Sequence, residues 1–244
     1  MTEIKNILLL LNKFVSFYDM KSVFLGGDAC LSIFLNKPVV DKKIEILCPT
    51  NEIAVHIGEL FSSEILEKTS KIENNRLIVQ VDDFDLIFQS DSLKYYMKEQ
   101  EIQNWMKSKE IDDVPLMSNV YGRDFTINTL LFSLNSGQFY DPTGQAISDI
   151  EDRVLRTVLP CEMIIKFDPL ICIKALKFSL QHDYFIESDF RLMLDKGLSH
   201  LDTITTTENI VKELIDILKI DSVKGLEMIK RYKLDKFIIA EYSK

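Results

Sequence analysis

The sequence predicts an α+β protein, with a mixed sheet in the first half of the chain and helices throughout the second half. Up to about residue 140, helical patterns alternate with short apolar runs that are typical of strands. After the turn signal DPTG at 141–144 the patterns are helical. A chain of 244 residues that is 46% hydrophobic can bury a core in each half. We therefore expect two domains, residues 1–158 and residues 159–244.

Elements of the first half follow from the apolar spacing and from turn and cap residues. We expect helices near residues 3–18, after Gly27, from Thr50 to about Phe61, and in an amphipathic segment from about Leu93 to Lys107. We expect strands at 22–25 (SVFL), 43–47 (KIEIL), 64–68 (EILEK), 76–81 (RLIVQV) and 84–88 (FDLIF).

Helices of the second half are expected at 161–165, 168–181, 187–198, 207–220 and 221–232. Residues that favour helix starts mark four of them. These are Asp168 followed by Pro169, Ser188 or Asp189, Thr207, and Asp221 or Ser222.

Composition limits the classes of partner and compartment. The net charge of -9 works against broad nucleic-acid binding, because phosphate backbones attract clustered lysine and arginine. The apolar run at 7–11 is far too short to span a bilayer, so we expect no membrane association. Four cysteines without metal-ligand or disulfide spacing indicate a reduced, cytoplasmic protein.

The strand at 40–47, VDKKIEIL, raises the question of a metal site. Its odd-numbered side chains share one face, which brings Asp41, Lys43 and Glu45 into line. Two carboxylates one residue apart on such a face could ligate divalent ions, but here Lys43 precedes Glu45. Asp41 and Glu45 lie about 13 Å apart along an extended strand, too far to share one ion.

The segment VFLGGDACLSIFL, which begins at Val23, runs from a strand through Gly26 and Gly27 into a helix. Backbone amides and a helix N-terminus in this geometry can cradle a phosphate. The alternative is that the two glycines only make a tight turn between strand and helix.

Two longer segments carry a family resemblance. Residues 122–158 (GRDFTINTLLFSLNSGQFYDPTGQAISDIEDRVLRTV) and residues 167–190 (FDPLICIKALKFSLQHDYFIESDF) resemble signatures of the class II tRNA nucleotidyltransferases (CCA-adding enzymes) and bacterial poly(A) polymerases. The resemblance implies a nucleotidyltransferase head domain followed by a helical neck that selects the incoming base. Family members continue into body and tail helices that hold tRNA, and we expect this chain to correspond to head and neck alone.

The family transfers a nucleotide to an RNA 3′ hydroxyl with two magnesium ions, held by a D-x-D strand motif and a third carboxylate. The resemblance aligns Lys43 and Glu45 with the two aspartates and Asp85 with the third carboxylate. Glu45 and Asp85 are thus the metal ligands that remain if Mg²⁺ binds at all. Asp85 is alternatively an exposed acid on a strand face. The charge at Lys43 opposes metal binding, so we assign no catalytic residue.

Other family positions match in part. The resemblance implies nucleotide-binding roles for Gly26, Gly27, Arg123, Asp124, Asn128, Asp168, Lys174 and Lys177. Gly122 stands where the family has the first of two arginines, and Cys30 and Leu31 stand at its Arg and Asp positions after the glycines. Arg123 and Asp124 could instead form a buried pair that ties head to neck.

The base-selecting motif Glu-Asp-x-x-Arg reads Phe167 to Ile171 here, and isoleucine cannot donate the hydrogen bonds of arginine. Asp168 before Pro169 is also the pattern of a helix N-cap, which we favour. Lys174 and Lys177 replace family arginines without the bidentate fork.

Three functions follow from the combined departures at the metal, phosphate and base positions. We expect a pseudoenzyme that serves RNA processing as a nucleotide-binding or partner-binding module. The alternatives are an active nucleotidyltransferase with an atypical Mg²⁺ site, and an interaction module whose cleft is filled by side chains. The expected ligand is ATP or CTP, RNA binding is weak or absent, and a protein partner or a homo-oligomer is possible.

Overall fold

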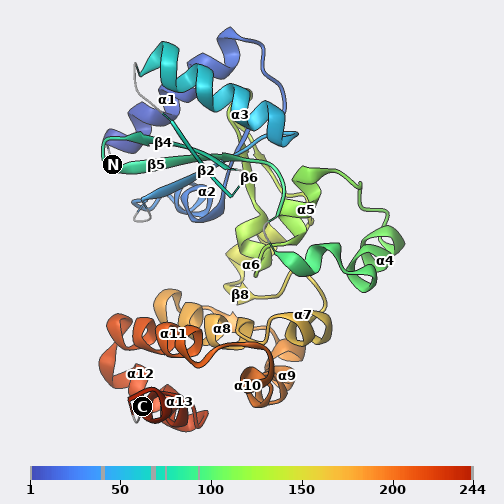
Figure 1. Cartoon of the computed structure of the whole chain (residues 1–244), viewed down its shortest axis with the longest axis vertical. Coiled ribbons are helices and arrows are strands. Elements are labelled where there is room, and N and C mark those ends of the chain that lie inside the picture. The colour runs from blue at the N-terminus through green and yellow to red at the C-terminus, as the bar shows by residue number, and fades with distance from the viewer. Residues whose placement is uncertain (1, 40–41, 67–69, 75, 93, 243–244) are drawn as a thin grey trace. The chain divides into compact units, whose positions relative to one another are not determined.

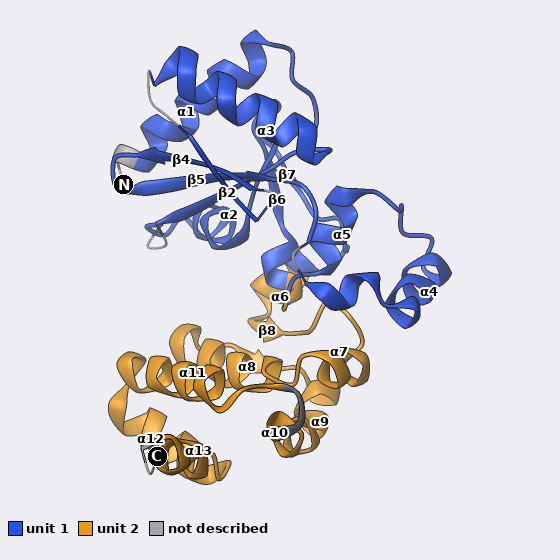
Figure 2. Ribbon diagram, viewed as in Figure 1, with its two compact units in different colours: residues 1–123, 127–147 blue, residues 124–126, 148–244 orange. Residues whose placement is uncertain are grey.

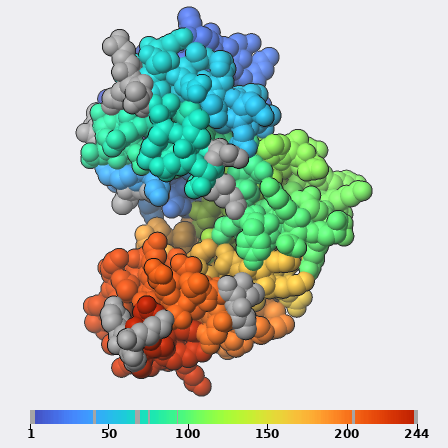
Figure 3. Space-filling model, viewed as in Figure 1, coloured from blue at the N-terminus to red at the C-terminus, as the bar shows by residue number. Residues whose placement is uncertain are grey.

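The computed structural model describes residues 2–39, 42–66, 70–74, 76–92 and 94–242. The chain forms two compact units (Figures 1 and 2), residues 1–123 with 127–147 and residues 124–126 with 148–244. The change from one unit to the other lies between Ile147 and Ser148, earlier than the domain boundary expected at residue 158. Within each unit, side chains close the space between the ribbons (Figure 3).

Unit 1 is built on a mixed seven-stranded sheet of order β3-β4-β5-β2-β1-β6-β7. β2 and β5 run parallel, and the other described neighbours are antiparallel. The strands are β1 (Phe24–Gly26), β2 (Lys43–Leu47), β3 (Lys71–Glu73), β4 (Arg76–Val81), β5 (Phe84–Gln89), β6 (Leu131–Ser133) and β7 (Phe139–Tyr140). Four of the five expected strands are confirmed.

The alternation along β2 separates the two faces of the sheet as the sequence predicts. Ile44 and Ile46 are fully buried, whereas Lys43 is exposed and Glu45 is intermediate. We call the face that carries Lys43, Glu45, Arg76, Gln80 and Asp85 the polar face; the register of β2, β5 and β4 brings these residues to the same side.

Helices α1 (Thr2–Phe17) and α3 (Asn51–Leu60) lie together over the opposite, apolar face (Figure 1). The Thr50 hydroxyl caps α3 by accepting from the Ile53 amide, as expected. A Cβ at Gly58 would lie 2.3 Å from Leu77 Cδ2, so glycine lets this helix approach the sheet closely.

The expected strand at 64–68 is wrong. Glu64 and Ile65 belong to a π-helical turn (Phe61–Ile65) that continues α3 directly. Its Phe61 is fully buried and stacks edge-on against Phe14 of α1, so packing on the apolar face keeps the segment helical. Residues 67–68 of the expected strand lie outside the described residues, as does Leu93 at the start of the expected amphipathic segment.

The remaining helices of unit 1 are short. They are α2 (Gly27–Phe34), the 3₁₀ turns Tyr95–Lys98 and Thr126–Thr129, α4 (Gln100–Ser108) and α5 (Pro115–Tyr121), with α6 (Ala146–Glu151) at the change of unit. Val120 of α5 joins Leu47 and Leu131 in a small core at one end of the sheet. This core sets the position of Arg123, two residues after α5.

Unit 2 is largely helical, with a two-residue parallel pair of β8 (Val154–Leu155) and β9 (Phe185–Ile186) and an isolated antiparallel bridge between Phe125 and Thr157. Its helices are α7 (Cys161–Phe167), α8 (Ile171–His182), α9 (Ser188–Ser199), α10 (Leu201–Ile204), α11 (Thr207–Ile220), α12 (Ser222–Arg231) and α13 (Asp235–Tyr242). All five helices expected in this half are confirmed.

Helices α7 and α11 start where expected, and the other three expected helices start one to three residues later. Asp221 caps α12 as one of the two predicted alternatives. Glu187 rather than Ser188 or Asp189 caps α9, and Thr206 rather than Thr207 caps α11. The N-cap position of α8 is Leu170, so the preferred interpretation of Asp168 as that cap is wrong. None of the described helices is both long enough and apolar enough to span a membrane.

Candidate functional site

Gly26 ends β1 and Gly27 begins α2 in a left-handed conformation with φ of 64°. A Cβ at Gly27 would lie 3.1 Å from Glu45 Oε2 and 3.3 Å from Arg123 Nη1. A Cβ at Gly26 would lie 3.0 Å from Arg123 Nη2. The two glycines therefore make room for an ion pair of the protein itself, as well as for the turn.

That ion pair joins β2 to the residue that follows α5. Arg123 Nη2 donates to Glu45 Oε2 at 2.6 Å and to Asn119 Oδ1 at 3.0 Å. The Arg123 side chain is 11% exposed and that of Glu45 is 31% exposed. The positive charge of Arg123 lowers the pKa of Glu45 despite the opposing effect of burial. Glu45 is therefore held ionised by a guanidinium.

Asp85, the expected third carboxylate, pairs in register with Lys43 across the parallel strands, and Glu45 pairs with Ile87. Paired residues in neighbouring strands lie about 4.8 Å apart and project to the same face. Lys43 is therefore the neighbour of Asp85 on the polar face, one pair removed from Glu45. Asp41, the other acid of this strand region, lies outside the described residues.

These residues do not fit a two-magnesium site. Mg²⁺ needs free carboxylate oxygens in octahedral geometry, and two ions need shared acidic ligands. Here one carboxylate already accepts from Arg123, and the other neighbours the ammonium of Lys43. The described residues also contain no group of three or more histidine, cysteine or acidic side chains placed to hold a metal.

Asn128 belongs to the same unit and contacts the start of α2. Its side-chain amide donates to Asp28 Oδ1 at 2.9 Å. Asp28 lies in the first turn of α2, where a carboxylate is favourable next to the positive end of the helix dipole. Asn128 thus ties the turn at 126–129 to the helix that follows the glycines.

The remaining predicted site residues lie in unit 2, on and before α8. Lys174 Nζ donates to Asp124 Oδ2 at 3.2 Å and to Asp168 Oδ2 at 3.3 Å. All three side chains are largely buried, with 18% to 26% exposed. Lys177, one turn later, pairs with Glu213 of α11. The base-selecting carboxylate of the family pattern is therefore engaged by a lysine of the same chain.

Arg123 and Asp124 serve different units, although they are adjacent in sequence. Arg123 is bound to Glu45 and Asn119 in unit 1, and Asp124 is bound to Lys174 in unit 2. The structure thus gives each residue a partner other than its neighbour.

Sequence reasoning missed two residues of this region. Asn119 lies one helical turn before Arg123 and orients its guanidinium, and Arg76 brings a further positive charge to the polar face from β4. The alternation of RLIVQV could have placed Arg76 on the face opposite Leu77, but its proximity to Glu45 depends on strand order.

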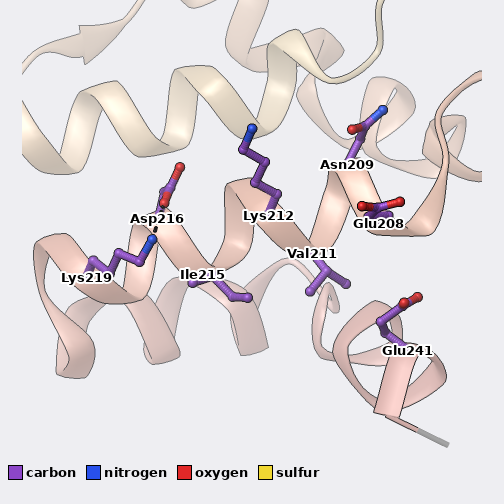
Figure 4. A pocket seen from close by; sticks show the side chains of 8 residues that line it. All are labelled: Glu208, Asn209, Val211, Lys212, Ile215, Asp216, Lys219 and Glu241. Atoms are coloured by element: carbon purple, nitrogen blue, oxygen red, sulfur yellow. Dashed lines mark hydrogen bonds and ion pairs between the residues drawn. The ribbon is translucent and has the colours of Figure 1, made fainter.

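A pocket of about 390 Å³ lies elsewhere, along α11 and α13 of unit 2 (Figure 4). It is lined by Glu208, Asn209, Val211, Lys212, Ile215, Asp216, Lys219 and Glu241. It contains none of the predicted site residues. Lys219 already neutralises Asp216 at 2.8 Å, so the pocket offers no concentrated charge for a ligand.

Comparisons with known proteins agree with this architecture. Residues 24–156 match the family model described as the poly(A) polymerase head domain. A CCA-adding enzyme of Staphylococcus epidermidis is 31% identical over 125 residues, which are 50% of this chain and 30% of that protein. The mitochondrial CCA tRNA nucleotidyltransferase of Saccharomyces cerevisiae is 31% identical over 67 residues, 28% of this chain and 12% of that protein.

Solved structures are similar over nearly the whole chain. A CCA-adding enzyme in complex with ATP matches with a TM-score of 0.73 and 20% identity, covering 98% of this chain and 54% of that one. A tRNA nucleotidyltransferase complexed with a primer tRNA and an incoming ATP analogue matches with a TM-score of 0.73 and 18% identity, covering 94% and 62%. This chain therefore spans little more than half of these structures and less than a third of the curated relatives. Because the family model matches more than half of its residues, the chain belongs to the poly(A) polymerase head-domain family, whose members include the class II tRNA nucleotidyltransferases.

Proposed function

We propose that this protein is a pseudoenzyme of its family, which transfers no nucleotides and acts as a nucleotide-binding or partner-binding module in RNA processing. One observation carries the proposal. The carboxylate of Glu45, aligned with a metal ligand, is bound by Arg123 at 2.6 Å, while Lys43 neighbours the aligned third carboxylate, Asp85. A guanidinium and an ammonium thus supply the positive charge that metal ions supply in the family.

The ammonium group of Lys43 opposes the binding of a divalent ion beside Asp85. A divalent ion bound about 4 Å from an ammonium would be repelled by roughly 8 kcal/mol at an effective dielectric constant near 20. This repulsion is large compared with the contribution of a typical surface ion pair to stability. Metal binding would also have to break the contact between Glu45 and Arg123.

Unit 2 supports the same proposal. Asp168 is bound by Lys174, and Ile171 stands where the family has an arginine that pairs with the incoming base. Base selection by this chain would therefore lack both polar groups of the motif. The losses at the metal and base positions affect separate parts of one mechanism.

The expected ligand is ATP or CTP, since structures that this chain resembles are complexes with ATP and with CTP. Mg²⁺ is needed only if the protein is active.

The net charge of -9 favours weak RNA binding or none, and a protein partner or a second copy of the chain would then be the target of the module. We place the protein in the cytoplasm.

One observation favours a second function, a pure interaction module. The Arg123–Glu45 pair lies directly on the Gly26–Gly27 turn, in the space where a phosphate would be cradled. If the pair never opens, no nucleotide enters. Titration calorimetry with ATP and CTP separates the two functions, because the interaction module gives no binding heat.

The test of the proposal is an incorporation assay. Purified protein is incubated with labelled ATP or CTP, an RNA, and Mg²⁺ or Mn²⁺, and extension of the RNA is followed on a gel. We expect no extension above that of the Glu45→Ala, Asp85→Ala double variant. Extension by the wild-type chain that the double variant lacks would show an active enzyme with an atypical metal site.

A further inference from the structure

We propose that Arg76 and Arg123 form a metal-free binding site for a chain of two or more phosphates on the polar face of the unit 1 sheet. This inference rests on the proposed function and deepens it by naming the ligand chemistry and the residue, Arg76, that completes the site. It concerns binding alone and assigns no reaction.

Unpartnered buried polar atoms gather at this face. Near this face, three side-chain atoms of the described residues are buried without a hydrogen-bond partner: Arg76 Nε, Gln89 Oε1 and Arg123 Nε. The side chains of Arg76 and Gln89 project to the polar face from the neighbouring strands β4 and β5, and Arg123 reaches it from the end of α5. Such unpartnered groups are rare in folded proteins, so their concentration here indicates a ligand or ordered water.

The surroundings of Gln89 strengthen this point. Gln89 is only 2% exposed. It lies in register with Leu47 of β2, which belongs to the small core formed with Val120 and Leu131. A buried carbonyl oxygen without a donor costs free energy unless something donates to it. A protonated phosphate or a hydroxyl group of a bound ligand would supply that donor, while its other oxygens accept from the arginines.

The charge of the face also favours an anion. Lys43, Lys71, Arg76 and Arg123 bring four positive charges, and Glu45, Glu73 and Asp85 bring three negative charges; Glu73, which lies in register with Arg76, is paired with Lys71 at 3.0 Å. This local excess contrasts with the net charge of -9 of the whole chain. Burial lowers the pKa of Arg76, and the charge of Arg123 lowers it further against the opposing effect of Glu45. An added anion would stabilise both guanidinium groups.

Arginine suits phosphate because its planar fork matches two phosphate oxygens. Arg76 and Glu45 lie on strands separated by β5, whose backbones are about 10 Å apart. Two guanidinium groups that approach Glu45 from opposite sides can each hold one phosphate of a short chain. The site therefore prefers a diphosphate or triphosphate over a single phosphate, whether it comes from a nucleotide or from inorganic pyrophosphate.

Glu45 is the internal competitor for this site. Its carboxylate now satisfies one amino group of Arg123 and would repel an incoming phosphate. Removing its charge should therefore tighten phosphate binding, whereas removing Arg76 should weaken it. These opposite effects distinguish a binding site from a cluster that only stabilises the fold.

The experiment is titration calorimetry of the whole chain with inorganic pyrophosphate, ATP and AMP in the presence of EDTA. We expect binding of pyrophosphate and ATP without added metal, and weaker binding of AMP. Arg76→Gln should weaken pyrophosphate binding about tenfold or more, as expected when a charged hydrogen bond is lost. Glu45→Gln should tighten it. Arg153→Gln is the matched control, because Arg153 is 62% exposed and lies in unit 2.

Several outcomes would overturn the inference. These are no binding of pyrophosphate by the wild-type chain in EDTA, binding only with added Mg²⁺, or equal affinity in the wild-type and Arg76→Gln proteins. Thermal unfolding checks that Arg76→Gln is folded; if it is not, the Glu45→Gln protein decides, and unchanged affinity there contradicts the site. RNA extension in the incorporation assay would instead contradict the proposed function and leave metal-free phosphate binding to be judged by these titrations alone.

Discussion

At the scale of single residues, Arg123 neutralises the carboxylate that the family pattern aligns with a metal ligand. The contact is short, the guanidinium is nearly buried, and Asn119 holds it from one turn away. Gly27 has to be glycine both for its positive φ and because a Cβ would crowd this pair. The departure at Lys43 and the ion pair at Glu45 therefore belong to one rearranged site.

The lowered pKa of Glu45 predicts how stability depends on pH. Its folded-state pKa lies below the ordinary value of 4.5, so the ion pair stabilises the fold fully above that pH and loses its effect as the pH falls through the folded-state pKa. Glu45→Gln should lower the free energy of unfolding by about 1–2 kcal/mol at pH 7. The difference from wild type should shrink between pH 5 and pH 3, measured by urea unfolding.

The control for this prediction is Glu73→Gln. Glu73 is 56% exposed and pairs with Lys71 on the surface, so its replacement should change stability by less than about 0.5 kcal/mol at every pH. A constant difference between Glu45→Gln and wild type from pH 7 to pH 3 would contradict the role given to the ion pair.

In unit 2, the ion pairs of Lys174 with Asp124 and Asp168 should stabilise the fold in the same way. Lys174→Met keeps the apolar stem but leaves Asp124 and Asp168 without this partner, and removing one partner of a largely buried ion pair is costly. We expect a loss of about 2–4 kcal/mol in the free energy of unfolding. Lys219→Met, at a lysine that is 70% exposed, should cost no more than about 0.5 kcal/mol. Equal losses in denaturant unfolding would show that burial of the Lys174 cluster contributes nothing.

At the scale of elements, strand register decides which charges meet. Parallel pairing of β2 with β5 places Lys43 beside Asp85 and Glu45 beside Ile87. A shift by one residue would send all of these side chains to the apolar face, so the buried Ile44 and Ile46 fix the register. The charge pattern of the polar face is thus maintained by the packing of the opposite face.

The close approach of α3 to that apolar face gives an element-scale prediction. Gly58→Ala would place a methyl group 2.3 Å from Leu77 Cδ2 and 3.0 Å from Phe88 Cδ2. We expect a loss of about 1–3 kcal/mol, even though alanine favours the helix itself. Glu59→Ala, on the exposed side of the same helix, should stay within about 0.5 kcal/mol. Chemical denaturation that gave the same stability for both variants would contradict this packing.

Local patterns predict most elements but not their partners. The alternation in KIEIL and FDLIF identifies β2 and β5, and Thr50 and Asp221 identify two helix starts. The pattern of EILEK favours a strand locally, but burial of Phe61 against α1 and the sheet keeps Glu64 and Ile65 in a helical turn. The contact of Arg123 with Glu45 joins residues 78 positions apart, so it depends on strand order and could not be read from spacing.

At the scale of the whole molecule, each unit neutralises its own aligned functional residues. Unit 1 pairs Glu45 with Arg123, and unit 2 pairs Asp124 and Asp168 with Lys174. Family membership accounts for the architecture of unit 1, and solved structures share the fold of both units, whereas activity depends on particular side chains. A shared fold alone therefore does not establish the family's chemistry for this chain.

The most direct test of this account is a titration of the wild-type chain with Mn²⁺, following the free ion by electron paramagnetic resonance. We predict no loss of the free-ion signal below millimolar Mn²⁺, because the positive charges of Arg123 and Lys43 already neutralise the carboxylates of Glu45 and Asp85. The Lys43→Asp protein, with two carboxylates one residue apart on β2, should bind Mn²⁺ more tightly than wild type. Binding of two Mn²⁺ ions per wild-type chain, abolished by Glu45→Ala, would contradict the account.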